Sequence, residues 1–453
     1  MSLPVLAIIN NSIDIMSEAK KTVLISTIQP VGGGVPQMVR FVMHCLSQKG
    51  YEIRLAYYEP YSVSPSLSVP LQRLLRWPFL SRKNRKPQVR IAEFEGVPAT
   101  GIGCWIPELE FTNYWKSSRW QTEIERCDFH LCVSGSNLAA LPYWQLKMPF
   151  LAWIATPWLE DREHRVNKFP WYRRCLDKLL IRPVCQYLER RIHQTGNVVA
   201  LSDYTRDSIN QLSGAGIKNV LPTPIDVQRF KPLDGLEIDK NHTETISSNT
   251  NSNISLNVDR KSIKIGFIGR FEDPRKNINL LLQAFALCND DIQQTIDLEL
   301  VLVGDTPTDK TKQLMQQLAI TEQVTVKPYV SDDELPQCLQ ELSLFVIPSH
   351  QEGLCIAALE AMSCGVPVIS TRCGGPESYL KQGENGLLID NNPTALKRAI
   401  LQIIEDTATL NEYSRLARQT VVEQFSITVA EQRFWQFFAE IYPESISSSV
   451  SSH

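Results

Sequence analysis

The chain has 453 residues, of which 43% are hydrophobic and 21% charged. This composition excludes a globally disordered protein and exceeds what one ordinary core holds, so two domains are expected. The formal net charge of -3 argues against a nucleic-acid-binding protein, which would show a basic balance.

Cysteine usage and hydropathy indicate a cytoplasmic protein. The eleven cysteines include no CxxC pair, which argues against a disulfide framework or a zinc site. The apolar run at residues 3–9 lacks a basic leader and is too short to span a bilayer. We therefore expect a reducing compartment, no secretion signal and no transmembrane helix.

The first half of the chain predicts an α/β domain at residues 21–232, after an N-terminal tail at residues 1–20. Residues 21–60 have the pattern of a strand, a glycine loop, an amphipathic helix and a second strand. Further apolar strands are expected at residues 129–135, 149–155 and 197–202. Apolar strands that alternate with helices are typical of a parallel sheet covered on both faces.

The second half predicts another doubly wound domain, at residues 263–424. The stretch 233–262 between the two domains is rich in Ser, Asn and Thr and is expected to be a flexible linker. An aromatic-rich amphipathic helix is predicted at residues 425–443, followed by a disordered polar tail at residues 444–453. Two such domains would bind a ligand in the cleft between them.

Two cations follow the first predicted strand of the second domain. Gly269 ends that strand, Arg270 follows it directly, and Lys276 lies six residues further on. At the carboxyl end of a parallel strand, such a pair could hold an anion in the cleft. The alternative is a pair of solvated loop charges.

Two glutamates, Glu352 and Glu360, lie in an apolar stretch punctuated by glycine. Gly353 allows close backbone approach, and a helix is predicted to begin near Leu354, so that its free N–H groups could bind phosphate. If both glutamates were helical, they would lie ~12 Å apart along the axis, about the reach from one end of a diphosphate-linked sugar to the other. Alternatively, Glu360 belongs to an exposed helix face.

A third candidate is the glycine loop at residues 30–35, which would let backbone amides approach an anion or a sugar; a plain tight turn is equally compatible with it. No Asp-x-Asp motif occurs, so a metal-bridged diphosphate site has no obvious ligands. Arg270, Lys276 and helix-terminal amides would then neutralise the diphosphate.

Together these motifs resemble family 4 glycosyltransferases of the GT-B architecture, over residues 21 to 442. The segments that carry the resemblance are VGGGV (31–35), VVALSDYTRD (198–207), PTPIDVQRFKP (222–232), IGRFEDPRKN (268–277), PSHQEGLCIAALEAMSCGVPVIS (348–370), CGGPESYL (373–380) and ENGLLI (384–389). The E-x7-E spacing of Glu352 and Glu360 is the most specific of these features.

The resemblance implies a retaining, metal-independent transferase that moves a hexose-type sugar from a nucleotide diphosphate donor to an acceptor hydroxyl, and that requires no cofactor. The donor, a UDP- or GDP-sugar, would be bound by the second domain, and the acceptor, a lipid, glycan or small glycoside, by the first. The terminal helix would cross back to the first domain.

The resemblance also assigns residues. Catalytic roles fall on Glu352, Arg270 and Lys276. Arg270 and Lys276 would hold the diphosphate, Glu352 the transferring sugar and Glu360 the ribose. The remaining donor-binding positions are Gly33, Gly34, Gly269, Tyr329, Gly353, Leu354, Cys355 and Ile356.

Three positions depart from the family pattern. Many members carry a His at the position of Thr156. In this chain Thr156 and Trp158 are the predicted acceptor-side residues. A glycine is frequent at the position of Cys355. In many members the strand beside the nucleobase ends in glycine. In this chain the corresponding residues are Lys327, Pro328 and Tyr329. Neither the sugar nor the nucleobase therefore follows from the sequence.

Residues 73–90 contain seven Arg or Lys and no acid, and residues 172–192 are also basic and apolar. Such surface could contact an anionic membrane, although charge runs are more often solvated.

Two other functions fit the fold: a non-catalytic sugar-binding or scaffolding relative, and a nucleotide-sugar epimerase or phosphorylase.

Overall fold

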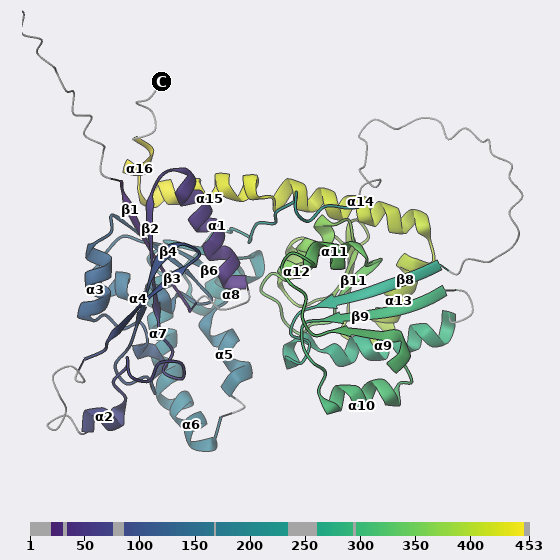
Figure 1. Ribbon diagram of the computed structural model, residues 1–453, viewed down its shortest axis with the longest axis horizontal. Helices are drawn as coiled ribbons and strands as arrows, with labels where there is room; N and C mark the ends of the chain where they lie inside the picture. The colour runs from purple at the N-terminus through teal and green to yellow at the C-terminus, as the bar shows by residue number, and fades with distance from the viewer. Residues whose placement is uncertain are drawn as a thin grey trace, which may run out of the picture.

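The chain folds into two halves, each built on a parallel sheet (Figure 1). The computed structural model describes residues 20–29, 34–75, 86–166, 169–233, 261–292 and 296–447. The predicted glycine loop is thus described only from Gly34 onward, and the predicted flexible linker lies almost wholly outside the described residues.

The first sheet has seven strands in the order β3-β4-β2-β1-β5-β6-β7. Its neighbouring strands are parallel except β3 and β4, which pair antiparallel. The strands are β1 (Thr22–Thr27), β2 (Glu52–Tyr58), β3 (Val89–Phe94), β4 (Val97–Ile102), β5 (Phe129–Ser134), β6 (Leu151–Ile154) and β7 (Val198–Ala200).

Helices cover both faces of this sheet. Along β1, the side chains of Val23 and Ile25 join one buried cluster and Leu24 joins another, as the period of two along a strand requires. The helices are α1 (Gly34–Gln48), α2 (Leu71–Leu75), α3 (Ser118–Glu125), α4 (Leu141–Leu146), α5 (Trp158–Val166), α6 (Trp171–Leu176), α7 (Arg182–His193) and α8 (Asp203–Ser213). A π-helical turn, η5 (Asp177–Ile181), joins α6 to α7.

The second sheet has six parallel strands in the order β10-β9-β8-β11-β12-β13. They are β8 (Lys261–Ile268), β9 (Ile296–Val303), β10 (Val324–Lys327), β11 (Leu344–Ile347), β12 (Val368–Thr371) and β13 (Gly386–Ile389). Its helices are α9 (Ile278–Ile292), α10 (Asp309–Gln317), α11 (Leu335–Gln340), α12 (Ile356–Ser363), α13 (Pro393–Ile404) and α14 (Thr407–Gln424).

The terminal helix α15 (Ile427–Ile441) crosses back to the first half, along the top of Figure 1. Its Phe438 ring lies 5.5 Å from that of Phe129 in β5. Just beyond the helix, the Tyr442 hydroxyl accepts the His130 backbone N–H at 3.0 Å. Burial of these aromatic rings fastens the chain end to the first sheet. The predicted two-domain α/β fold with a returning helix is confirmed.

Each sheet reverses its strand order beside its first strand. In the second sheet β9 lies on one side of β8 and β11 on the other, and in the first sheet β2 and β5 flank β1 in the same way. In open parallel sheets, ligands bind outside the carboxyl ends of the strands at this reversal. The loops after β1, β8 and β11 therefore define the site.

Two details differ from the sequence predictions. The tail predicted to be disordered begins with a four-residue helix, α16 (Glu444–Ser447), where Ser445 donates backbone and side-chain hydrogen bonds to the Tyr442 carbonyl. Helix α12 starts at Ile356, two residues after Leu354. No helix among the described residues has the length and apolarity needed to cross a membrane.

Candidate active site

Two glycines allow the loop after β8 to lie close to the loop after β9. Gly269 has a φ of +149°, and a Cβ on Gly304, at the end of β9, would lie 2.2 Å from the Gly269 carbonyl oxygen. Asp273 then caps a short turn by accepting the Arg275 backbone N–H at 3.1 Å. Although burial favours its neutral form, the hydrogen bonds from Arg275 lower the pKa of Asp273 to about 2. This turn sets the position of Lys276.

Lys276 makes a partly buried ion pair with Glu352. The Lys276 Nζ lies 2.7 Å from Oε1 and 2.9 Å from Oε2 of Glu352. Burial opposes the charge of Lys276, but the nearby carboxylate prevails and raises its pKa. The Ser349 hydroxyl also donates to Glu352, at 2.5 Å. The structure thus brings together two sequence-predicted residues that lie 76 positions apart.

The backbone around Glu352 is fixed by the loop after β12. Glu352 donates its N–H to the Cys373 carbonyl at 2.7 Å and accepts the Gly375 N–H at 2.8 Å. A Cβ on Gly375 would lie 2.5 Å from the Gly353 carbonyl oxygen. Glu352 is therefore part of a short bridge before α12, not of the helix. The helical spacing of ~12 Å between the two glutamates does not apply.

The first half of the chain meets this bridge directly. The Ser202 hydroxyl donates to the Gly353 carbonyl at 2.6 Å. A Cβ on Gly353 would come within 3.2 Å of the Ala155 carbonyl and 3.4 Å of the Thr156 hydroxyl. The two halves consequently touch at the candidate site, and Thr156 lies beside Gly353.

The start of α12 combines an unusual backbone with a close approach. Cys355, the N-cap residue, has a φ of +65° and a ψ of +73°, in the left-handed region. Burial raises the pKa of its thiol. A Cβ on Gly34, at the start of α1, would lie 3.1 Å from Ile356 Cδ1. The helix N-terminus, whose first N–H groups could receive a phosphate, therefore faces the described end of the glycine loop.

Glu360 lies in a different part of the interface between the halves. It is buried in α12 and lines a cavity of about 390 Å³ with residues of α1, α11 and the segment 224–230. Burial raises its pKa to about 7, while Arg229 and a hydrogen bond from Gln37 favour its charged form. The alternative of an exposed helix face is wrong.

The other predicted donor-side residues differ in exposure. The Arg270 side chain is 72% exposed, and its guanidinium lies 3.6 Å from Asp273. Tyr329, just beyond β10, is also exposed, whereas Leu354 is buried. Gly33 lies outside the described residues. Arg270 and Tyr329 are thus open to a ligand, and Leu354 could contribute only its backbone.

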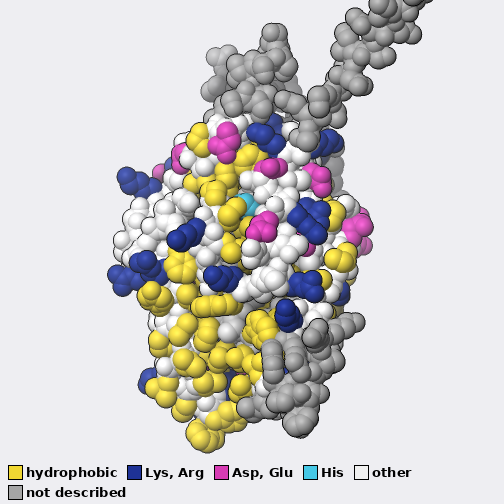
Figure 2. Space-filling model, turned by 90° about the vertical axis from the view of Figure 1, so that its left-hand side faces the viewer, with side chains coloured by type: hydrophobic (Ala, Val, Ile, Leu, Met, Phe, Trp, Pro, Cys, Tyr) yellow, Lys and Arg dark blue, Asp and Glu magenta, His cyan; other side chains and the backbone are white. Residues whose placement is uncertain are grey.

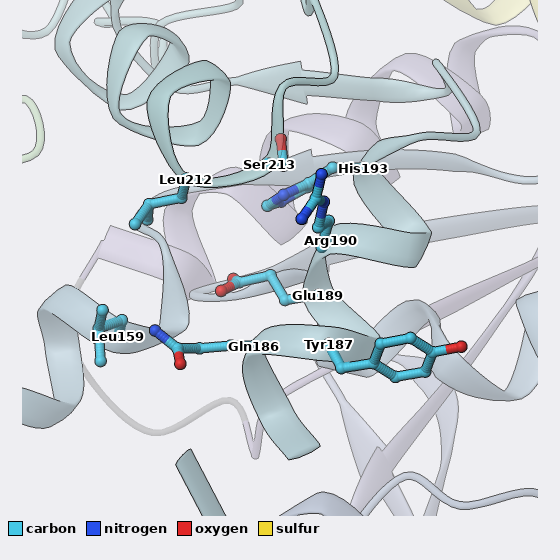
Figure 3. A pocket seen from close by; sticks show the side chains of 8 residues that line it. All are labelled: Leu159, Gln186, Tyr187, Glu189, Arg190, His193, Leu212 and Ser213. Atoms are coloured by element: carbon cyan, nitrogen blue, oxygen red, sulfur yellow. The ribbon is translucent and has the colours of Figure 1, made fainter. Parts of the chain in front are cut away.

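The predicted acceptor-side role does not fit the position of Trp158, because its side chain is buried and only 3% exposed. Its indole N–H donates to Glu110 at 2.9 Å and its backbone N–H to Glu189 at 2.8 Å. Glu189 and His193 of α7 line a second cavity of about 320 Å³, with Leu212 and Ser213 at the end of α8 (Figure 3). Burial raises the pKa of Glu189 to about 7. Trp158 therefore anchors α5 behind Thr156.

Three contributing residues were not found from the sequence: Ser349, Ser202 and Gln37. Ser202 could have been suspected, because a serine directly before a helix is a typical N-cap, and it does accept the Thr205 N–H. Nothing in the pattern marks Gln37 or Ser349. Among the described residues, no group of three or more His, Cys, Asp or Glu side chains is arranged to hold a metal ion.

Comparisons with known proteins relate the chain to glycosyltransferases. A family model described as glycosyl transferases group 1 matches residues 248–420. The chain is 25% identical over 411 residues to an MMP alpha-(1->4)-mannosyltransferase of Mycolicibacterium hassiacum, which covers 87% of this chain and 91% of that protein. It is 31% identical over 160 residues to a D-inositol 3-phosphate glycosyltransferase of Paenarthrobacter aurescens, covering 34% of this chain and 37% of that protein. The chain spans about two fifths of the length of the first curated relatives it matches.

Solved structures share the whole arrangement. Sucrose-phosphate synthase from Thermosynechococcus elongatus superimposes with a TM-score of 0.66 at 18% identity, over 94% of this chain and 100% of that one. HepE of Anabaena, solved with UDP and glucose, gives a TM-score of 0.62 at 17% identity, over 93% and 100%. These relatives and structural neighbours are glycosyltransferases. Residues 248–420 are thus similar to glycosyl transferases group 1, and the chain has the GT-B fold.

The left-handed backbone of Cys355, just before α12, gives a first prediction. A left-handed conformation costs a non-glycine residue roughly 1–2 kcal/mol. Replacing that residue by glycine removes this cost, but glycine also gives the unfolded chain more conformational freedom, which offsets part of the gain in stability. Cys355→Gly should therefore leave the free energy of unfolding unchanged or raise it by about 1 kcal/mol. Cys355→Val should lower it by about 1–2 kcal/mol, because a β-branched side chain fits the left-handed region less well than cysteine does, as measured by urea denaturation.

The matched control is Cys175→Gly, because Cys175 is helical and exposed and glycine there removes no strain. It should give no gain in stability. A loss of more than about 1 kcal/mol on Cys355→Gly would show that the thiol, not the backbone, decides this position.

The buried Glu360 predicts a pH-dependent stability. Its folded pKa of about 7 exceeds the ordinary value of 4.5, so the folded state holds the proton more tightly than the unfolded chain does. This stabilisation is fully present below pH 4.5 and is lost as the pH rises toward 7. Glu360→Gln should match the parent near pH 4.5 and exceed its stability at pH 8, by about 3 kcal/mol at most.

Urea denaturation of both proteins across this pH range measures the difference. Glu405→Gln, on an exposed side chain, serves as control and should run parallel to the parent. A Glu360→Gln curve that is also parallel to the parent would refute a raised pKa.

Proposed function

We propose that the chain is a retaining, metal-independent glycosyltransferase of family 4, which transfers a hexose-type sugar from a UDP- or GDP-sugar to an acceptor hydroxyl. The observation that carries the proposal is the Lys276–Glu352 ion pair at the point where the second sheet reverses its strand order, beside the N-terminus of α12. HepE, which shares the fold, was solved with UDP and glucose, which favours UDP.

In this proposal, the donor diphosphate replaces Glu352 as the main counter-charge of Lys276. Arg270, which is exposed beside the same loop, and the first N–H groups of α12 would share the charge. Charge-assisted hydrogen bonds of this kind contribute roughly 1.5–3 kcal/mol each. As the leaving diphosphate gains charge in the transition state, these groups would stabilise it more than the ground state.

Glu352, released from part of its ion pair, would then accept hydrogen bonds from hydroxyls of the transferring sugar. Glu360 would accept them from the ribose, which requires displacing Gln37. Tyr329 would lie beside the nucleobase and Gly33 and Gly34 over the donor. No side chain serves as nucleophile in this scheme: the acceptor attacks on the face from which the diphosphate departs, and a phosphate oxygen takes its proton.

We assign donor binding to residues 263–424 and acceptor binding to residues 21–232. Thr156, which lies against Gly353, is the proposed acceptor-side residue, with Trp158 holding α5 behind it. The acceptor class is a lipid, a glycan or a small glycoside, and a cytoplasmic location is proposed from the cysteine usage.

Membrane contact through residues 73–90 stays a prediction, because residues 76–85 lie outside the described residues. The two flanking arginines have contacts within the fold. Arg73 donates to the Ser68 carbonyl at 3.1 Å, and Arg90 lies 2.9 Å from the Glu59 carboxylate.

The test is turnover of Lys276→Ala and Glu352→Ala. Each should lower sugar release from the accepted donor by about 100-fold or more, because each removes a group that acts on the developing charge or on the sugar. The donor is first found by screening UDP- and GDP-sugars for hydrolysis by the parent protein.

Circular dichroism should show that both variants stay folded, and Lys381→Ala, on an exposed lysine of the same domain, should leave turnover unchanged. Near-normal turnover in either Lys276→Ala or Glu352→Ala would contradict the proposed function.

A further inference from the structure

A short projecting segment of the first half exposes large apolar side chains. All six residues of α6 are exposed, including Trp171 at 71% and Tyr172 at 62%. In the π-helical turn that follows, Leu179 is 79% exposed. Leu176 and Leu180 are also exposed. A soluble surface rarely gathers so many large apolar groups without a partner.

The same segment is strongly cationic at its surface. Arg173, Arg174 and Lys178 are exposed. Residues 169–191 contain two acids, Asp177 and Glu189, and both are buried. Asp177 pairs with the buried Arg162 at 2.5 Å. Negative charge is therefore withdrawn from this surface, while positive charge and aromatic rings remain on it.

We call this the α6 surface, which consists of Trp171, Tyr172, Arg173, Arg174, Leu176, Lys178, Leu179 and Leu180. In Figure 1, α6 forms the lower end of the first half, opposite α15, with α2 beside it. Figure 2 shows hydrophobic side chains gathered over this lower end, with Lys and Arg among and above them. The lower end of the first half, where α6 lies, thus presents a broad apolar area.

We propose that the α6 surface docks on an anionic lipid bilayer. Aromatic and leucine side chains flanked by arginine and lysine are the pattern of a segment that lies in the membrane interface, with rings among the headgroups and cations on the lipid phosphates. Each cation near an anionic surface strengthens partitioning roughly fivefold.

Charge complementarity favours a bilayer over a second copy of the chain. A two-fold interface presents the same patch from both sides. Because Arg173, Arg174 and Lys178 are exposed and residues 169–191 have no exposed acid, two copies of this patch would bring cations together, and like charges across an interface oppose binding. Phosphate headgroups instead supply the missing negative charge.

The α6 surface is connected to the candidate site by one helix. α5 begins at Trp158, two residues after Thr156, and runs toward α6 (Figure 1). Docking would therefore hold the acceptor side of the site close to the bilayer. The consequence that the acceptor is carried by a lipid rests on the proposed function, whereas the docking itself does not.

The chain offers its own probe of this contact. Cys175 is the one exposed cysteine of the described residues, and it lies on α6. A polarity-sensitive fluorophore attached to it should shift to the blue with phosphatidylcholine vesicles that contain phosphatidylglycerol, and much less with phosphatidylcholine alone. High salt should weaken the binding, because it screens the cations.

Vesicle flotation of variants of the full chain separates the two parts of the surface. Leu179→Asp and the pair Arg174→Glu with Lys178→Glu should each lower binding to anionic vesicles by about tenfold or more. Ile91→Asp, on a side chain that is 76% exposed in β3, and Lys218→Glu with Lys381→Glu, on exposed lysines elsewhere, are the matched controls and should bind like the parent.

Three results would overturn the proposal: no binding of the parent to anionic vesicles at low salt, equal losses in Leu179→Asp and Ile91→Asp, or self-association in solution that Leu179→Asp abolishes. Donor hydrolysis without vesicles should be unchanged in Leu179→Asp. If docking fails but hydrolysis is normal, the proposed function stands and the docking proposal falls. If the protein binds vesicles but hydrolyses no donor, the docking proposal stands and the proposed function falls.

Discussion

The candidate site depends on one partly buried charge interaction, the pairing of Lys276 with Glu352. The Glu352 carboxylate outweighs the effect of burial and raises the pKa of Lys276, as an opposite charge at this distance does. Removing either partner would leave the other in a poorly solvated position. The loops after β8 and β11 are therefore held at a fixed distance by electrostatics as well as by the sheet.

Close backbone contacts make this pairing possible. Glu352 can reach Lys276 because the bridge that carries it is hydrogen-bonded to the loop after β12, and that loop passes so near Gly353 that only a glycine fits at position 375. The same bridge is met from the first half by Ser202. The site is consequently built from both halves, and α15 keeps those halves together by packing its aromatic face on the first sheet.

The sequence predicted the fold well because strand and helix patterns are local. It also singled out Lys276 and Glu352, since each follows an apolar strand and the carboxyl ends of neighbouring parallel strands meet at one edge. It could not show that the two form an ion pair, because this depends on contacts over 76 residues. The helical spacing assumed for Glu352 and Glu360 failed for a related reason: the bridge with the loop after β12 keeps Glu352 out of the helix.

Cys355 seemed out of place in a phosphate loop, and the structure explains why glycine would be expected there, as the backbone is left-handed. The buried position of Trp158 was hidden too, since nothing local reveals what covers a side chain.

The central claim is that the donor diphosphate competes with Glu352 for Lys276, and calorimetric titration with UDP tests it most directly. Glu352→Gln removes the competing charge, so it should bind UDP more tightly than the parent, by about tenfold, whereas Lys276→Met should bind it more weakly. Opposite shifts in these two variants are the predicted result. Weaker binding of UDP by Glu352→Gln, in parallel with Lys276→Met, would contradict the account.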